Sequence, residues 1–205
     1  MFFSKAKQEL DPPPVQERRR SIRHATVMQI AKIRLGACRE ELCLLRDVSP
    51  EGVKAEIYVT VDVGMPIEIE LRTGHVIGGR IAWAEDKMIG VAFDEPMPMS
   101  AMLAHCSFDD RLGKLRPPRL VVSMHAMLKV GHQEKAVRIG NISQAGLQID
   151  APEPFHANSA CTIALPGLAP RAATIRWCRE GQAGLMLAQS FDYAEFAAWR
   201  AVVAA

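Results

Sequence analysis

The chain has 205 residues, of which 49% are hydrophobic and 23% are charged, and these values predict a folded globular protein and exclude a largely disordered one. Twenty-five Lys and Arg against 23 Asp and Glu leave a formal charge of +2, too small for a protein that coats nucleic acid or an anionic membrane through bulk charge. The N-terminus lacks an apolar stretch of signal-peptide length, and no segment approaches a membrane span. We therefore expect a cytoplasmic protein that does not contact membranes.

The residue types that carry catalysis and metal binding show no recognisable spacing. Five Cys form an odd set without a CxxC pair, and six His show neither HxxxH nor HExxH spacing. A Walker-type glycine loop and a GxSxG elbow are also missing from the sequence. We expect reduced thiols, no metal site and no enzymatic activity.

The first part of the chain predicts a tail followed by an anion-binding segment. Three consecutive prolines, residues 12–14, separate a tail at residues 1–16 from the residues that follow, because they favour extended geometry. Residues 17–24 then hold the densest positive charge on the chain, and its basic side chains are Arg18, Arg19, Arg20, Arg23 and His24. A guanidinium binds phosphate in a forked geometry and also reads guanine edges. This segment predicts a local site for a nucleotide.

Alternating apolar and polar residues predict short strands after this segment. The pattern marks strands at 27–35 and 67–71 and then two strands, 76–83 and 89–93, around a polar turn. Short, evenly spaced strands with glycine turns favour a small closed barrel. A turn with at most a short helix and a linker at 101–113 follow.

A polar turn, Asp47-Val48-Ser49-Pro50-Glu51-Gly52, lies between the first predicted strands. Asp47 can accept hydrogen bonds from guanine N1–H and N2–H, and Ser49 can donate or accept. Gly52 permits either a positive φ or close backbone approach. Asp and Ser also occur in many turns simply because they bond their own backbone, so this turn alone is weak evidence for a binding site. The arginines that precede it strengthen the interpretation.

The chain repeats itself at an offset of 94 residues. This offset relates the Asp47 turn to Asn141-Ile142-Ser143-Gln144-Ala145-Gly146, Trp83 to Trp177, and Gly90 to Gly184. We predict two homologous domains, at 17–100 and 114–205, with the matched tryptophans in the two cores. Residues 192–203 begin with an acidic cap and predict a helix that closes the second domain.

The motifs together resemble a known family. Arg19-x-x-x-Arg23, followed by Asp47-x-Ser49-x-x-Gly52 and by Trp83, is similar to the PilZ domain family, and residues 114–190 resemble a second copy. The resemblance implies an all-β fold of two tandem six-stranded barrels with short peripheral helices. Many family members bind the bacterial second messenger cyclic di-GMP.

The resemblance also implies roles for residues. Arg19 and Arg23 would clamp the phosphates and guanines of cyclic di-GMP, Asp47 and Ser49 would contact the ligand from the barrel surface, and Gly52 would shape the turn. The auxiliary contacts would come from Arg18, Arg20 and His24. Ligand binding would order the arginine segment and rearrange the domains, which would signal to a protein effector that the sequence does not identify. Cyclic di-GMP would be a ligand, with no cofactor required.

The second copy departs from the pattern. The positions 94 residues after Arg19 and Arg23 are Gly113 and Pro117, and Arg116-Pro117-Pro118-Arg119 places two arginines at a spacing of three. We predict that this copy does not bind cyclic di-GMP and serves in interactions. Two alternatives stay open: a docking module without nucleotide binding, and a barrel that binds RNA or single-stranded DNA. The latter ranks last because aromatics make up only 6% of the chain. The pathway, oligomeric state and ligand stoichiometry also stay open.

Overall fold

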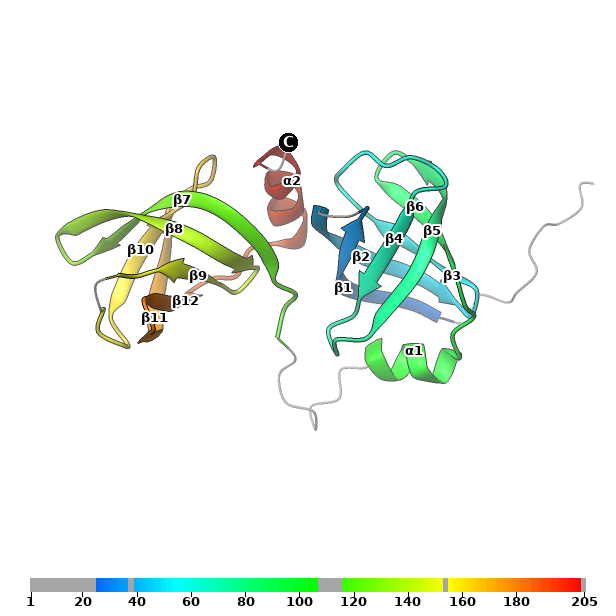
Figure 1. Ribbon diagram of the computed structural model, residues 1–205, viewed down its shortest axis with the longest axis horizontal. Coiled ribbons are helices and arrows are strands. Elements are labelled where there is room, and N and C mark those ends of the chain that lie inside the picture. Colours follow the sequence, from blue (N-terminus) through cyan, green and yellow to red (C-terminus); the bar gives the residue numbers. More distant parts are fainter. Residues whose placement is uncertain (1–24, 37–38, 107–115, 153–154, 204–205) are drawn as a thin grey trace, which may run out of the picture.

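The computed structural model describes residues 25–36, 39–106, 116–152 and 155–203. These residues form two closed six-stranded barrels with two short helices (Figure 1). The all-β class and the two tandem barrels predicted from the repeat are thereby confirmed. The arginine segment at 17–24 lies outside the described residues. The boundary between the tail at 1–16 and the first domain at 17–100 therefore stays a prediction.

The first barrel has the spatial strand order β1-β2-β3-β6-β5-β4, and β4 closes it by pairing with β1. All its neighbouring strands are antiparallel. Its elements are β1 (Ala25–Leu35), β2 (Arg39–Ser49), β3 (Gly52–Glu56), β4 (Pro66–Glu70), β5 (Val76–Glu85) and β6 (Met88–Phe93), followed by helix α1 (Met99–Cys106).

The second barrel repeats this order as β7-β8-β9-β12-β11-β10, and β10 closes it by pairing with β7. The same topology in both halves is what the offset of 94 residues predicts. Its elements are β7 (Leu120–Val130), β8 (Gln133–Ser143), β9 (Gly146–Asp150), β10 (Ala160–Ala164), β11 (Arg171–Arg179) and β12 (Gln182–Leu187), followed by helix α2 (Tyr193–Val203).

Strand β2 is buried on both of its faces. Alternate side chains of a strand point to opposite faces, and Cys43 and Leu45 accordingly belong to the core of the first barrel. Leu42 and Leu44 point outward, yet they are also buried because they belong to the hydrophobic cluster of the second barrel. The apolar run in β2 therefore serves two cores.

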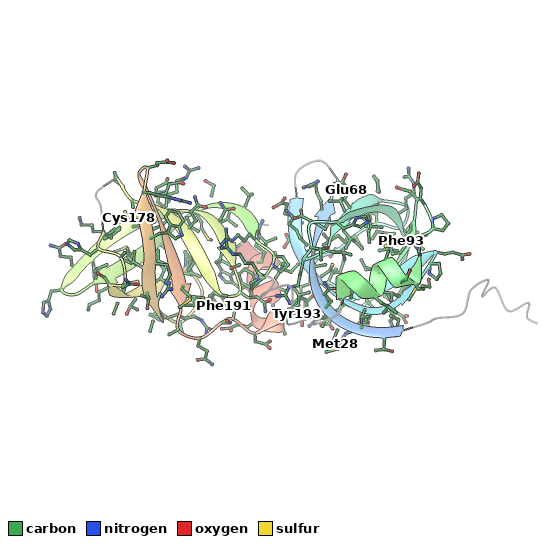
Figure 2. All side chains as sticks on the ribbon, turned by 90° about the horizontal axis from the view of Figure 1, so that it is seen from below. Met28, Glu68, Phe93, Cys178, Phe191 and Tyr193 are labelled. Carbon is green, nitrogen blue, oxygen red and sulfur yellow. The ribbon has the colours of Figure 1, made fainter. Side chains whose placement is uncertain are left out.

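Helix α2 covers this outer face of β2 and joins the two barrels (Figure 1). Phe196 and Trp199 pack in the second barrel's cluster, as predicted for a helix that closes that barrel. The Tyr193 hydroxyl donates a hydrogen bond of 2.7 Å to the carbonyl of Glu56 in the first barrel. Its ring meets that of Tyr58 edge to face, with centroids 5.8 Å apart. Figure 2 shows Tyr193 at the junction of the barrels, a contact that the sequence did not predict.

A charged seam lies beside this apolar contact. Glu40 accepts a hydrogen bond of 3.2 Å from the backbone N–H of Val121 in the second barrel and pairs with Lys32 at 3.2 Å in its own barrel. Arg200 of α2 donates to the Glu40 carbonyl at 3.4 Å. Partial burial opposes ionisation of Glu40, but the Val121 and Lys32 hydrogen bonds prevail and lower its pKa. The carboxylate of Glu40 thus links both barrels.

Candidate functional site

The turn predicted to touch a ligand in the first barrel is the hairpin between β2 and β3. Ser49 and Gly52 are paired across it, and the Ser49 hydroxyl donates to the Gly52 carbonyl at 3.1 Å. Asp47 accepts a hydrogen bond of 3.1 Å from the Thr26 hydroxyl. Gly52 is required for close approach, because a Cβ there would lie 2.3 Å from the carbonyl oxygen of Val91. The structure therefore brings the predicted Asp47, Ser49 and Gly52 together on one hairpin.

The second barrel has the same hairpin between β8 and β9. Ser143 donates to the Gly146 carbonyl at 3.1 Å, and a Cβ at Gly146 would lie 2.3 Å from the Leu185 carbonyl oxygen. Asn141 takes the position of Asp47, and its amide donates to the side-chain oxygen of Gln148 at 3.0 Å. The two hairpins differ in charge but share their geometry.

The prediction that the matched tryptophans lie in the barrel cores is wrong. Trp83 is 38% exposed and Trp177 is half-buried, and neither belongs to a core cluster. Each ring lies over a glycine of the neighbouring strand. A Cβ at Gly90 would be 2.0 Å from Trp83 Nε1, and one at Gly184 would be 2.1 Å from Trp177 Nε1. Both tryptophans are therefore parts of the outer surface next to the hairpins.

The reason for this difference is a β-bulge. The pairing of β5 with β6 shifts between Ile81 and Trp83, and that of β11 with β12 shifts between Ile175 and Trp177. The extra residue in the bulged strand breaks the alternation and re-aims the side chain that follows it. Each tryptophan therefore leaves the inner face that its neighbouring isoleucine occupies.

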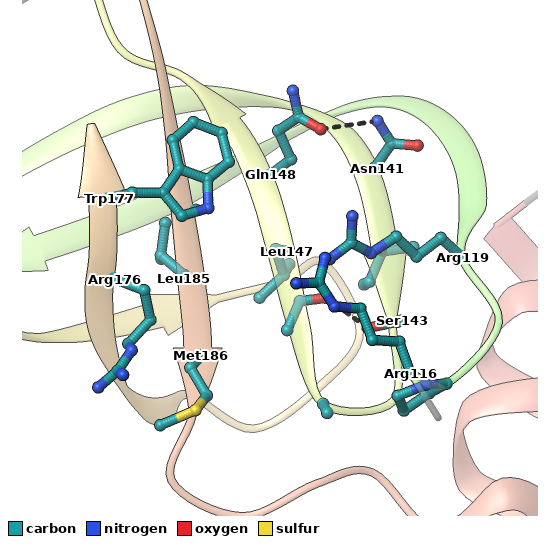
Figure 3. A pocket seen from close by; sticks show the side chains of 15 residues that line it. Arg116, Arg119, Asn141, Ser143, Leu147, Gln148, Arg176, Trp177, Leu185 and Met186 are labelled. Carbon is teal, nitrogen blue, oxygen red and sulfur yellow. Dashed lines mark hydrogen bonds between the residues drawn. The ribbon is translucent and has the colours of Figure 1, made fainter. Parts of the chain in front are cut away.

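An open pocket of about 320 Å³ lies on the outer face of the second barrel, between the hairpin and Trp177 (Figure 3). Its polar wall contains Asn141, Ser143 and Gln148, and its apolar lining includes Leu147, Leu185 and Met186. Three arginines, Arg116, Arg119 and Arg176, complete it, and no carboxylate is among the lining residues. A pocket with this lining suits an anion that also carries a planar or apolar part.

The three pocket arginines differ from the others in the described part of the chain. No hydrogen bond or ion pair joins the guanidiniums of Arg116, Arg119 or Arg176 to another described residue. Every other described arginine has an interaction with the protein, and these are Arg34, Arg39, Arg46, Arg72, Arg80, Arg138, Arg171, Arg179 and Arg200. The uncompensated guanidiniums therefore gather at one pocket.

Five of the predicted site residues fall outside the described part of the chain: Arg18, Arg19, Arg20, Arg23 and His24. The spacing of three between Arg116 and Arg119 argued against a nucleotide site in the second copy, and no pattern in the sequence pointed to Arg176 or to a surface position of Trp177. The repeat offset did mark the position of Trp177. The alternation of a strand, however, does not reveal a bulge.

Metal-binding side chains do not cluster among the described residues. Over residues 25–36, 39–106, 116–152 and 155–203, no group of three or more His, Cys, Asp or Glu side chains is placed to hold a metal ion. In the same ranges neither helix has the length and apolar character needed to cross a membrane. Burial raises the pKa of the Cys43 thiol to about 12, so this side chain stays protonated in the core.

The fold and the hairpins define a class: a tandem-barrel protein whose repeated polar hairpin adjoins an arginine-lined surface pocket. The model of one family, described as the PilZ domain, matches residues 115–201, which span the second barrel and α2. Residues 115–201 therefore match the PilZ domain family. The matched range excludes residues 17–100, on which the resemblance in the sequence was based.

The chain is also similar to solved structures, at low identity. PlzA of Borreliella burgdorferi, in complex with c-di-GMP, is 10% identical with a TM-score of 0.41, over 89% of this chain and 93% of that one. The Bacillus subtilis inhibitor of motility MotI/DgrA is 12% identical with a TM-score of 0.36, over 88% and 97%. YcgR of Escherichia coli, in complex with c-di-GMP, is 8% identical with a TM-score of 0.34, over 87% and 83%. No curated protein matches the chain.

Proposed function

We propose that this protein is a cytoplasmic receptor for cyclic di-GMP and not an enzyme. The observation that carries the proposal is the repeated Asp/Asn-x-Ser-x-x-Gly hairpin, whose second copy lies beside arginines that have no partner among the described residues and belongs to a range that matches the PilZ domain. Cyclic di-GMP has two phosphates for guanidiniums and two guanines whose edges carry donors and acceptors. Its charge and shape therefore complement such a surface.

The first barrel is the site that the sequence motifs favour. Arg19 and Arg23 supply the forked donors for phosphate and guanine, while Asp47 accepts from a guanine edge and Ser49 contacts the ligand beside it. Gly52 keeps the hairpin close to β6. Additional cationic contacts come from Arg18, Arg20 and His24. The described hairpin supports this assignment because Asp47 and Ser49 lie together on the barrel's outer edge.

The pocket of the second barrel is a second candidate for the same ligand. Its support is that the guanidiniums of Arg116 and Arg119, which have no partner among the described residues, lie next to Asn141 and Ser143. The spacing of three between the two arginines differs from the spacing of four between Arg19 and Arg23 and by itself argues against binding. Their common position at one pocket argues for it, since an uncompensated cluster of cations is stabilised by a bound anion.

The proposed output is a change in how the barrels and a protein effector are arranged. Helix α2 docks on β2, and β2 continues into the hairpin that holds Asp47, so the ligand site and the barrel interface share one strand. The alternative is a docking module that contacts a partner without nucleotide. Absence of any cyclic di-GMP binding by the folded protein would favour that alternative.

Isothermal titration of cyclic di-GMP into the full chain, with GTP as the control ligand, tests the proposal. The variants are Arg19→Ala/Arg23→Ala for the first barrel and Arg116→Ala/Arg119→Ala for the second. We expect selective binding that the first pair weakens by at least tenfold, because each lost charge-assisted hydrogen bond removes about 1.5–3 kcal/mol. Loss of binding only with the second pair would move the site to the second barrel. If the intact protein shows no selective binding of cyclic di-GMP, the proposal that it is a receptor is overturned.

A further inference from the structure

We propose that Arg176 is a third phosphate-binding residue of the second-barrel pocket and gives that pocket a preference for ligands with two separated phosphates. This inference rests on the proposed function and deepens it, because it names a residue that the nucleotide motifs do not contain. It goes beyond Arg116 and Arg119, which precede the barrel, since Arg176 belongs to the barrel itself.

The bulge in β11 places Arg176 at the pocket. Ile175 pairs with Leu185 and Trp177 pairs with Gly184 on β12, so Arg176 is the extra residue without a cross-strand partner. It is exposed, whereas Ile175 is fully buried. Bulges commonly serve to direct a side chain at a functional surface. Here the bulge directs Arg176 and Trp177 toward the same surface.

Arg176 also stands on a different wall from the other two arginines. Arg116 and Arg119 lie in the segment that leads into β7, and Figure 3 shows Arg176 on the opposite side of the pocket, next to Met186. Cations on two walls and no lining carboxylate make a positive field across the opening. A ligand with one phosphate can engage one wall, whereas a ligand with two separated phosphates can engage both.

The first barrel provides a comparison within the same chain. Its bulge lies at the same point of the fold, between Ile81 and Trp83, but the residue there is Ala82. The bulge is therefore present without an arginine, and Arg176 is not required to form it. The sequence places Arg18, Arg19, Arg20 and Arg23 before the first barrel, whereas the pocket of the second barrel is lined by Arg116 and Arg119 from before β7 and by Arg176 from the bulge.

The experiment uses the full chain in an Arg19→Ala/Arg23→Ala background, so that titration reports the second barrel. Arg176→Ala is added to this background, and the matched control is Arg138→Ala. Arg138 is an exposed arginine of the same barrel, lies outside the pocket and is paired with Asp150 at 3.4 Å. Cyclic di-GMP and inorganic pyrophosphate are titrated calorimetrically, and circular dichroism melts check that each variant is folded.

We expect Arg176→Ala to weaken cyclic di-GMP binding by about 10- to 100-fold and Arg138→Ala to change it by less than about twofold. Cyclic di-GMP binding that Arg176→Ala leaves unchanged would overturn the inference and leave the receptor function standing. Pyrophosphate has two adjacent phosphates, so Arg176-dependent pyrophosphate binding without cyclic di-GMP binding by any form would overturn the preference for separated phosphates and refute the proposed function as well. If neither ligand binds in this background, the inference is overturned. Cyclic di-GMP binding by the intact protein would then report the first barrel alone.

Discussion

Tyr193 connects the two barrels, and its substitution tests whether they behave as one unit. It is 8% exposed, and its hydroxyl donates to the Glu56 carbonyl at 2.7 Å. Tyr193→Phe removes this hydrogen bond and should lower the free energy of unfolding by about 1 kcal/mol. Tyr193→Ala also removes a buried ring, and large-to-small changes of aromatic residues cost about 3–5 kcal/mol. We therefore expect the alanine variant to lose about 2–4 kcal/mol more than the phenylalanine variant.

The assay is urea unfolding followed by tryptophan fluorescence and circular dichroism. Trp83 is the single tryptophan of the first barrel, while the second half of the chain has Trp177 and Trp199. A Trp83→Phe background therefore reports the second half alone. Without the Tyr193 substitution, the fluorescence and circular dichroism transitions should coincide, because Leu42 and Leu44 of the first barrel lie in the second barrel's cluster and the barrels should unfold together. In Tyr193→Ala they should separate into two transitions.

A double-mutant cycle with Tyr58→Ala isolates the contribution of the ring pair. The edge-to-face contact at 5.8 Å between Tyr58 and Tyr193 should give a coupling free energy of about 0.5–1.5 kcal/mol. The reasoning is refuted if Tyr193→Ala costs no more than Tyr193→Phe and the coupling is zero. Coincident unfolding signals in Tyr193→Ala would show that other contacts suffice to join the barrels.

Three further outcomes are expected. Burial raises the pKa of Tyr193 above its ordinary value of about 10. The unfolded chain therefore loses the phenol proton at a lower pH than the folded protein, and stability that is present below about pH 10 is lost as the pH rises toward the folded-state pKa. Urea midpoints measured from about pH 8 to about pH 11 should accordingly fall less in Tyr193→Phe than in the native protein. Gly184→Ala should lower the free energy of unfolding by about 1–3 kcal/mol, because the new Cβ would lie 2.1 Å from Trp177 Nε1 and would displace that ring. An unshifted tryptophan emission spectrum would contradict this displacement. Glu40→Gln should lower the free energy of unfolding by about 1–3 kcal/mol in thermal denaturation, because Glu40 binds Val121 and Lys32. The control Glu134→Gln, at an exposed ion pair, should lower it by less than about 0.5 kcal/mol. Equal losses would contradict the role of Glu40 in joining the barrels.

The repeated architecture could be predicted because it depends on local features. The alternation of apolar residues marks strands, and landmarks at a constant offset show that both halves share one topology. The acidic cap at Asp192 also marked the start of α2 correctly, since its carboxylate accepts from the Ala194 N–H at 2.8 Å. These signals are confined to a few neighbouring residues.

The positions of the tryptophans could not be predicted from the same alternation. Ile81 points inward, and a period of two would place Trp83 on the same side. The bulge adds one residue to the strand and moves the ring to the outer surface. The nearest sign in the sequence is Gly90, which leaves room for the ring, but its meaning depends on the cross-strand register.

The docking of α2 on the first barrel was also beyond the sequence pattern. The run Leu42-Cys43-Leu44-Leu45 was not among the predicted strands, and a continuous apolar run does not show what covers each face of a strand. Only tertiary structure shows that Leu42 and Leu44 belong to the hydrophobic cluster of the second barrel, which also contains Tyr193. The candidate site was likewise only half predicted, since the hairpins were recognised but the pocket arginine on β11 was not.

The outer surfaces of the two barrels show how the copies have diverged. The positions 94 residues after Leu42 and Leu44 are Ala136 and Arg138, both of which are exposed. The first barrel therefore buries this face under α2, whereas the second barrel leaves it in solvent, where Arg138 pairs with Asp150. A ligand at the first hairpin would act on β2, the strand that carries the interface. A ligand at the second pocket would contact Arg119, two residues before Val121, whose N–H binds Glu40 of the first barrel. The two candidate sites thus adjoin the contact between the barrels from opposite sides.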